Sequence, residues 1–184
     1  MNLASYDNSD FDRGAPPWKE ALWVMMRVLF FQNSIPWPSE LRAALLRAFD
    51  AKVGQGLVIR ENVNISHPWR LVIGDHVWIG EDVGILSLAQ VSIGSNVCIS
   101  QRAYLCTGNH DFRREDFKLT VAPITIHDSS WVAAMSFIGP GVEIGTGSVI
   151  AAGSVVSKNV PPGSIVRGNP AQVGEKAAGE NAEN

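Results

Sequence analysis

Large aliphatic residues recur at every sixth position through the second half of the chain. From residue 126 onward one register holds only β-branched aliphatic side chains: Ile126, Val132, Ile138, Ile144, Ile150 and Val156. A period of six fits neither a helix, whose buried face returns after about 3.6 residues, nor a strand, whose buried face returns after two. The chain must therefore turn a corner after each short strand, and three such sides would close a triangular coil.

The same register appears upstream with three interruptions. Its members there are Val53, Ile59, Ile65, Ile73, Ile79, Ile85, Ile93, Ile99 and Leu105. Two of the interrupted steps carry two extra residues, and the step from Leu105 to Ile126 spans twenty-one. Extra residues must bulge outward from a stacked column. The pattern therefore predicts a parallel β-helix over residues 51–174, with residues 106–123 extruded from it as a loop.

The first fifty residues follow a helical pattern instead. Residues 18–31 are apolar on most sides, but charged residues interrupt them, and their apolar core is shorter than the roughly 20 residues needed to cross a bilayer. Two interpretations stay open for this helix: contact with a membrane surface, or packing against the coils or a neighbouring subunit. Ser39 is expected to cap a second helix that runs to Phe49. Residues 1–50 are thus predicted to form a helical extension that packs on the coils.

Composition and charge narrow the function classes. A length of 184 residues fits a single soluble domain. A net charge of −3 lacks the positive charge that is typical of proteins that bind nucleic acid. Cys98 and Cys106 lack C-x-x-C spacing, and no secretory leader is apparent, which favours free thiols in the cytoplasm. Residues 175–184 are rich in Ala, Gly, Glu and Asn, and we expect this tail to be disordered.

Four short motifs stand out beside the register. They are His67-Pro68-Trp69-Arg70-Leu71, Val77-Trp78-Ile79-Gly80, Cys106-Thr107-Gly108-Asn109-His110-Asp111 and Gly168-Asn169-Pro170-Ala171. With the Trp-rich start, they resemble the hexapeptide-repeat acetyltransferases, and within them the enzymes of colanic acid and exopolysaccharide biosynthesis. The resemblance covers nearly the whole chain. It implies an all-β fold with a left-handed parallel β-helix, acetyl-CoA as co-substrate, no metal, and a homotrimer with active sites between subunits.

His110 in the extruded loop is the candidate general base. Moving an acetyl group from a thioester to a sugar hydroxyl needs a base for the hydroxyl proton and donors for the developing oxyanion. The resemblance assigns the base to His110. Asn109 and Asp111 either position the ring or the acceptor, or cap the backbone of the loop. No covalent acyl-enzyme is implied, and Cys106 is interpreted as a packed thiol.

The resemblance also implies a groove for coenzyme A along the outside of the coils, between adjacent subunits. Trp131 would pack against the pantetheine arm, and the backbone N–H of Ala134 would donate to the oxyanion. Further candidate contacts are Ala152, Ser157 and Lys158. The arginines usual in relatives after the Asn-Pro-Ala segment are missing here, so Arg167 or Lys176 would bind the phosphates of coenzyme A. Plain alternatives are that Trp131 merely covers a coil face and that Lys158 is an ordinary solvated lysine.

The residues that could bind the sugar acceptor are less clearly indicated. Ser87 stands where relatives usually have an asparagine that binds the acceptor. Trp69 and Trp78 could each stack on a sugar ring or pack beneath the N-terminal helices. In the expected trimer, His110 of one subunit would face Trp131 of the next.

Two other function classes stay open. Some left-handed β-helices are zinc carbonic anhydrases, but His67, His76, His110 and His127 do not have the spacing of such ligands. A scaffold that has lost its catalytic site is the other class, and the intact loop around His110 argues against it. A serine acetyltransferase would need a larger N-terminal domain. We therefore expect an O-acetyltransferase that acts on a sugar or polysaccharide precursor in the cytoplasm, with the N-terminal helix as the only candidate contact with the inner membrane face.

Overall fold

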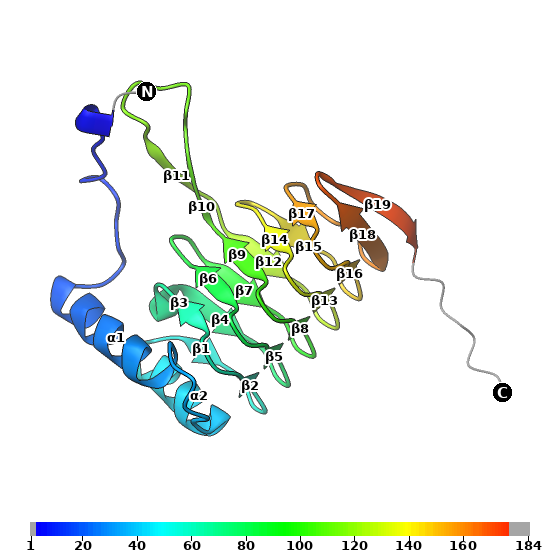
Figure 1. Cartoon of the computed structure of the whole chain (residues 1–184), viewed down its shortest axis with the longest axis horizontal. Coiled ribbons are helices and arrows are strands. Elements are labelled where there is room, and N and C mark those ends of the chain that lie inside the picture. The colour runs from blue at the N-terminus through cyan, green and yellow to red at the C-terminus, as the bar shows by residue number, and fades with distance from the viewer. Residues whose placement is uncertain (1–2, 177–184) are drawn as a thin grey trace.

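The computed structural model describes residues 3–176 and shows a three-sided column of stacked coils with two helices at its N-terminal end (Figure 1). Each side of the column is one mainly parallel sheet. Sheet 1 contains β1 (Lys52–Val53), β4 (Leu71–Ile73), β7 (Val91–Ile93), β12 (Ile124–Ile126) and β15 (Glu143–Ile144). Sheet 2 contains β2 (Val58–Ile59), β5 (Trp78–Ile79), β8 (Cys98–Ile99), β13 (Trp131–Val132), β16 (Val149–Ile150), β18 (Ser164–Gly168) and β19 (Ala171–Lys176). Sheet 3 contains β3 (Asn64–Ile65), β6 (Gly84–Leu86), β9 (Tyr104–Cys106), β14 (Phe137–Ile138) and β17 (Val155–Val156).

The six-residue register forms the core of this column. In sheet 1, Ile73 pairs with Ile93, Ile93 with Ile126, and Ile126 with Ile144, and all four side chains are buried. The step between partners is twenty residues in the early coils and eighteen in the late ones, as the spacing predicted. The step from Ile93 to Ile126 includes the extruded loop. The predicted parallel β-helix is confirmed.

Glycine follows many of the buried register positions because the next coil passes very close to it. A Cβ atom added to Gly74 would lie 2.6 Å from Ser95 Oγ and 2.7 Å from Ser95 N. At the same corner, Ser95 Oγ accepts a hydrogen bond from the Asp75 N–H at 3.0 Å. Side chains from one coil therefore satisfy the backbone of the previous coil, and only glycine leaves room for them.

Two helices seal the N-terminal end of the column. Helix α1 covers Pro17–Phe30 and α2 covers Ser39–Ala48, with short 3-10 turns at Leu3–Ser5 and Pro68–Arg70. Trp23 of α1 is buried, and its indole N–H donates to the Ile65 carbonyl at 2.9 Å. Arg42 of α2 is also buried, and its guanidinium donates to the carbonyls of Phe30, Ile35 and Ile59. The helices are thus anchored directly on the first coil.

The predicted cap of α2 is wrong. Pro38 occupies the N-cap position, and no side chain caps this helix. Ser39 is the first helical residue, and its hydroxyl oxygen accepts a hydrogen bond from the Ile59 N–H at 3.1 Å. The hydroxyl therefore joins α2 to β2, because Ser39 faces the column and not the helix end.

One antiparallel hairpin and one terminal hairpin interrupt the coils. Strands β10 (Gly108–His110) and β11 (Leu119–Val121) leave the column as an arm, which projects to the top of Figure 1. At the other end, β18 and β19 pair antiparallel and close the column. Strand β19 continues to residue 176, where a disordered tail from residue 175 was expected. The rest of that expected tail, residues 177–184, lies outside the described residues.

Candidate functional site

The arm that carries His110 is fixed at its base by a buried threonine. The Thr107 hydroxyl donates to the Leu86 carbonyl at 2.7 Å and accepts from the Ala89 N–H at 2.9 Å. Beyond it, His110 lies directly opposite Leu119 in the antiparallel ladder. The histidine thus sits on a paired strand and not on a loose loop, so its backbone position is well defined.

The His110 ring is held in one tautomer. Its Nδ1 atom lies 2.8 Å from the Phe117 carbonyl oxygen. Because a carbonyl can only accept, Nδ1 must carry the proton, and the Nε2 lone pair of the neutral ring is left to take a proton. The Phe117 ring stacks on the imidazole at 4.3 Å with an interplanar angle of 1°. Tyr6 from the N-terminal segment contacts it edge-on at 5.6 Å. This arrangement suits a general base.

The side chains on either side of His110 bind the backbone of the arm. Asn109 Oδ1 accepts a hydrogen bond from the His110 N–H at 2.8 Å. Asp111 Oδ1 accepts one from the Arg113 N–H at 3.0 Å. No hydrogen bond among the described residues joins either side chain to the imidazole. Of the two interpretations left open by the sequence, this geometry favours backbone capping.

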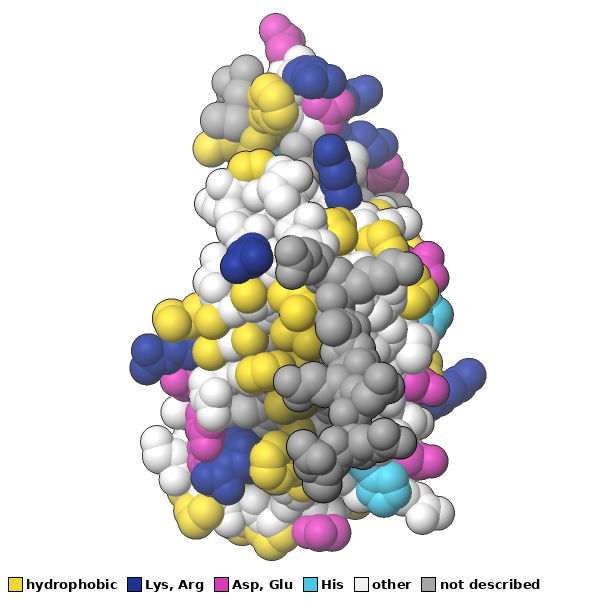
Figure 2. Space-filling model, turned by 90° about the vertical axis from the view of Figure 1, so that its right-hand side faces the viewer, with side chains coloured by type: hydrophobic (Ala, Val, Ile, Leu, Met, Phe, Trp, Pro, Cys, Tyr) yellow, Lys and Arg dark blue, Asp and Glu magenta, His cyan; other side chains and the backbone are white. Residues whose placement is uncertain are grey.

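The tip of the arm carries charges of both signs, seen at the top of Figure 2. Arg114 and Asp116 form an ion pair at 2.8 Å, and Lys118 pairs with Asp10 at 2.7 Å. The pair with Lys118 and the Tyr6 contact both connect the N-terminal segment to the arm. A hydrogen bond from the Trp69 indole to the Arg13 carbonyl connects the same segment to the column. The N-terminal segment therefore lies beside the candidate base.

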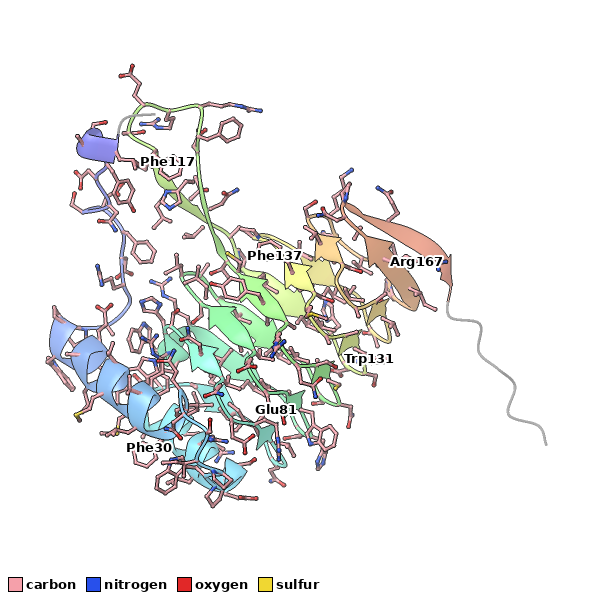
Figure 3. The ribbon with its side chains drawn as sticks, in the orientation of Figure 1. Phe30, Glu81, Phe117, Trp131, Phe137 and Arg167 are labelled. Carbon is pink, nitrogen blue, oxygen red and sulfur yellow. The ribbon has the colours of Figure 1, made fainter. Side chains whose placement is uncertain are left out.

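Trp131 projects outward from sheet 2 at some distance from the arm, as the labelled Trp131 and Phe117 in Figure 3 show. Its side chain is 48 % exposed, and its indole N–H donates to Ser100 Oγ at 2.9 Å. In the outward column of sheet 2 it lies between Cys98 and Val149. One chain therefore does not bring the candidate base and Trp131 together.

The other residues expected to contact coenzyme A lie on the C-terminal side of Trp131. The Ala134 carbonyl accepts a hydrogen bond from the Gly153 N–H, so Ala134 and Ala152 lie at the same corner of successive coils. Within residues 3–176 the Ala134 N–H has no hydrogen-bond acceptor. Three further candidates are exposed, namely Ser157, Lys158 and Arg167. The side chain of Lys176, the alternative phosphate ligand, is not among those the structure describes.

The structure does not present Ser87 to an acceptor. Ser87 is fully buried, and its hydroxyl accepts from the His67 N–H at 2.9 Å and donates to the His67 carbonyl at 3.0 Å. The expectation that Ser87 binds the acceptor is therefore wrong, because its side chain points into the column. Trp69 is half-buried, with the Lys19 ammonium 5.5 Å from its ring centre, so it packs beneath the N-terminal helix.

The described residues contain a packed thiol but no group of side chains suited to a metal ion. Cys106 is buried and its Sγ lies 3.1 Å from the Gly108 carbonyl oxygen, as a packed thiol would. In the part of the chain that the structure describes, no group of three His, Cys, Asp or Glu residues could hold a metal ion.

None of the described helices is both long enough and apolar enough to traverse a bilayer.

Two features of the site had little or no signal in the sequence. Phe117 fixes His110 through its backbone carbonyl, which any residue type could supply. Tyr6 reaches His110 from more than a hundred residues away, and no repeat relates the two. A third feature, a hollow around Trp78 on sheet 2, has a signal in the sequence: Trp78 precedes a buried register residue, so its side chain must face outward.

Comparison with known proteins places these features among transferases. The family model described as bacterial transferase hexapeptide (six repeats) matches residues 123–158. "Putative colanic acid biosynthesis acetyltransferase WcaF" of Escherichia coli (strain K12) is 42 % identical over 161 residues, 88 % of each chain. Galactoside O-acetyltransferase of the same strain is 32 % identical over 146 residues, 78 % of this chain and 72 % of that one.

A solved structure agrees with these relatives. The hexapeptide-repeat acetyltransferase VCA0836 of Vibrio cholerae O1 biovar eltor, solved in complex with acetyl coenzyme A, superposes with a TM-score of 0.79. It is 27 % identical to this chain, and the superposition covers 87 % of both chains. Most of this chain therefore has the same fold as a protein that was solved with the acetyl donor bound.

Proposed function

This chain belongs to the hexapeptide-repeat acetyltransferases, with their left-handed parallel β-helix, and from that premise we propose that it acetylates a hydroxyl group of a sugar with His110 as the general base. It is an acetyl-CoA-dependent acetyltransferase. The observation that carries the assignment of the base is the hydrogen bond from His110 Nδ1 to the Phe117 carbonyl. That bond leaves Nε2 free to accept a proton from the sugar hydroxyl.

The reaction needs one proton acceptor and one hydrogen-bond donor from the protein. His110 Nε2 takes the hydroxyl proton as the sugar oxygen attacks the thioester carbonyl carbon. The Ala134 N–H donates to the carbonyl oxygen, which gains negative charge during the attack. The bond from carbon to sulfur then breaks, and His110 returns its proton to the departing thiolate. No residue of the chain is acylated.

The residues along sheet 2 fit the co-substrate, acetyl-CoA. Trp131 offers an exposed, flat apolar surface for the pantetheine arm. Lys158 and Arg167 are exposed cations on the coils that follow, and phosphates of coenzyme A need cations of this kind. Ala152 and Ser157 lie between Trp131 and Lys158 along the chain. These residues form the proposed donor groove.

The site is proposed to form between two subunits of a homotrimer. In one chain, His110 stands on the arm while Trp131 lies on sheet 2, which supports a site in which a second copy supplies one of them. A slim column also exposes much of its surface, which favours association with copies of itself. A closed ring of three copies would pair each arm with the donor groove of the next subunit.

Helix α1 is proposed to hold the enzyme at the inner face of the membrane, and the cytoplasmic location stays a prediction. Its outward-facing large side chains are apolar: Trp18, Leu22, Val24, Met25, Val28 and Leu29 are all at least about one third exposed. The opposite face of the helix carries Trp23, which is buried against the first coil. An apolar helix face that points away from the protein is typical of a helix lying in the membrane interface.

Calorimetric titration with coenzyme A tests the proposed groove. The wild-type protein should bind close to one coenzyme A per subunit, and Trp131→Ala should lose this binding. Tyr104→Ala is the matched control, because Tyr104 is an exposed aromatic residue on sheet 3. A wild-type protein that does not bind coenzyme A would contradict the proposal and favour the scaffold interpretation.

A further inference from the structure

A hollow lies on sheet 2 on the N-terminal side of Trp131. Residues from β2, β5 and β8 and the corners after them line it, and its volume is about 360 Å³. Trp78 stands within it and is 60 % exposed, with Val58 and Cys98 on either side in the same outward column. The floor of the hollow is therefore apolar and contains one large flat ring.

Polar side chains border this apolar floor on one side. Arg60 Nε lies 2.9 Å from Glu81 Oε1, and Gln101 lines the same hollow. The Glu81 backbone N–H and the Arg60 side chain hold the pKa of the Glu81 carboxyl below its usual range, so this group is a carboxylate at neutral pH. The border thus offers a carboxylate and an amide oxygen as acceptors, with guanidinium and amide N–H groups as donors.

This combination matches the chemistry of a sugar ring. One face of a pyranose consists of C–H groups that can lie on an indole, while its hydroxyl groups need both donors and acceptors at the edge. We propose that the Trp78 hollow binds a sugar ring of the acceptor other than the ring that is acetylated, and this inference rests on the proposed function. The natural acceptor is therefore an oligosaccharide or polysaccharide precursor, not a free monosaccharide.

The position of the hollow agrees with this assignment. Trp78 pairs in register with Cys98, and Cys98 pairs with Trp131, so the two tryptophans are two rungs apart on one face. At about 4.8 Å per rung they are roughly 10 Å apart, about the length of two sugar residues. The proposed donor residues extend from Trp131 toward the C-terminal coils. The N-terminal direction along sheet 2 is left for the acceptor.

A second copy of the chain is the competing occupant. The centre of an interface between subunits is depleted in charged residues. Here Arg60 is exposed at the edge of the hollow, and Glu81 lies directly beside it. Such a polar border suits a hydroxylated ligand better than an apolar contact between copies.

Binding to an array of mono-, di- and trisaccharides tests the inference, with labelled full-length protein as the probe. The wild-type protein should bind at least one di- or trisaccharide, and Trp78→Ala should weaken that binding about tenfold or more. Trp78→Phe should retain part of it, and Glu81→Gln should weaken it as well. Tyr104→Ala, which removes an exposed aromatic residue from sheet 3, should bind as the wild type does.

Trp131→Ala separates this inference from the proposed function. It should lose coenzyme A but keep the oligosaccharide, because the two ligands use different rungs of sheet 2. Absence of oligosaccharide binding by the wild type, or equal binding by Trp78→Ala, would overturn the inference. So would dissociation of the Trp78→Ala oligomer in sedimentation analysis, because the hollow would then be a contact between copies.

Discussion

The Phe117 carbonyl oxygen accepts a hydrogen bond from His110 Nδ1 at 2.8 Å, and the two rings stack in parallel. Seven residues separate them in the chain, and the antiparallel arm brings them together. This single backbone contact decides which nitrogen of the histidine can act as a base. It also shows that the arm is pre-organised in the isolated chain, before any partner subunit or substrate binds.

Replacing the proposed base should abolish most of the turnover while leaving donor binding intact. His110→Ala removes the group that takes the hydroxyl proton, so kcat for acetyl transfer should fall by roughly two or more orders of magnitude. Release of the coenzyme A thiol measures the rate, and calorimetry measures coenzyme A affinity. His127→Ala is the control, since His127 pairs with Glu143 on sheet 1. Unchanged turnover would remove His110 from the mechanism.

Loss of the Phe117 ring should disturb the base without removing it. Phe117→Ala keeps the carbonyl but leaves the imidazole free to tilt, so we expect roughly a tenfold lower kcat, since a small misplacement of a catalytic group lowers the rate. The coenzyme A affinity should not change. Phe117→Tyr, which keeps a stacked ring, should restore most of the rate. Equal rates for the Ala variant and the wild type would show that the ring does not position His110.

The column could be predicted from the sequence because its core repeats one requirement at every coil. Each position of the six-residue register must hold a β-branched or similar aliphatic side chain, so these fifteen positions independently indicate the same geometry. The extruded arm was also predictable, since residues that break the register cannot fit in the column. What the sequence could not show is how the arm folds, because its decisive contact uses a backbone carbonyl.

The error at Ser87 has a physical explanation in the strand period. Ser87 stands two residues after Ile85, and a period of two places both side chains on the inward face. The same rule places Trp78 and Trp131 outward, because each immediately precedes a buried register residue. Resemblance to relatives suggested a role for Ser87, whereas the alternation along the strand already indicated a buried hydroxyl.

Acid should destabilise the protein through His67. Burial lowers the pKa of this side chain, and its Nδ1 atom has no hydrogen-bond partner among the described residues. The unfolded chain, with a histidine pKa of about 6.5, therefore binds a proton more readily than the folded chain, and stability should fall as the pH drops below that value.

Thermal unfolding at a series of pH values measures this effect. His67→Gln should show a smaller loss of Tm between about pH 7.5 and pH 5.5 than the wild type, because the group that titrates has been removed. Identical slopes for the wild type and His67→Gln would assign the acid sensitivity to other groups.

A methyl group at the tight corner of Gly74 should destabilise the column. In Gly74→Ala the new Cβ would lie within 2.7 Å of the Ser95 backbone nitrogen, so neighbouring coils must move apart. We expect the free energy of unfolding to fall by about 1–3 kcal/mol in denaturant titrations. Gly139→Ala is the milder comparison, because its nearest neighbour, the Val156 carbonyl oxygen, is 3.2 Å away. Equal stabilities of the two variants would contradict the close-approach argument.

The exposed face of α1 should bind uncharged as well as anionic membranes. Its large outward residues carry no charge, so insertion of apolar side chains, and not attraction to lipid head groups, would supply the binding energy. Flotation with phosphatidylcholine vesicles should therefore carry the wild-type protein upward even at high salt, which screens charge interactions. Met25→Glu places a carboxylate in the middle of this face and should lower the bound fraction about tenfold, whereas Val173→Glu, an equally exposed position on β19, should not. Wild-type protein that stays at the bottom of the gradient with both lipid types would contradict the membrane proposal, and a smaller Met25→Glu oligomer in sedimentation would then indicate that another subunit covers α1.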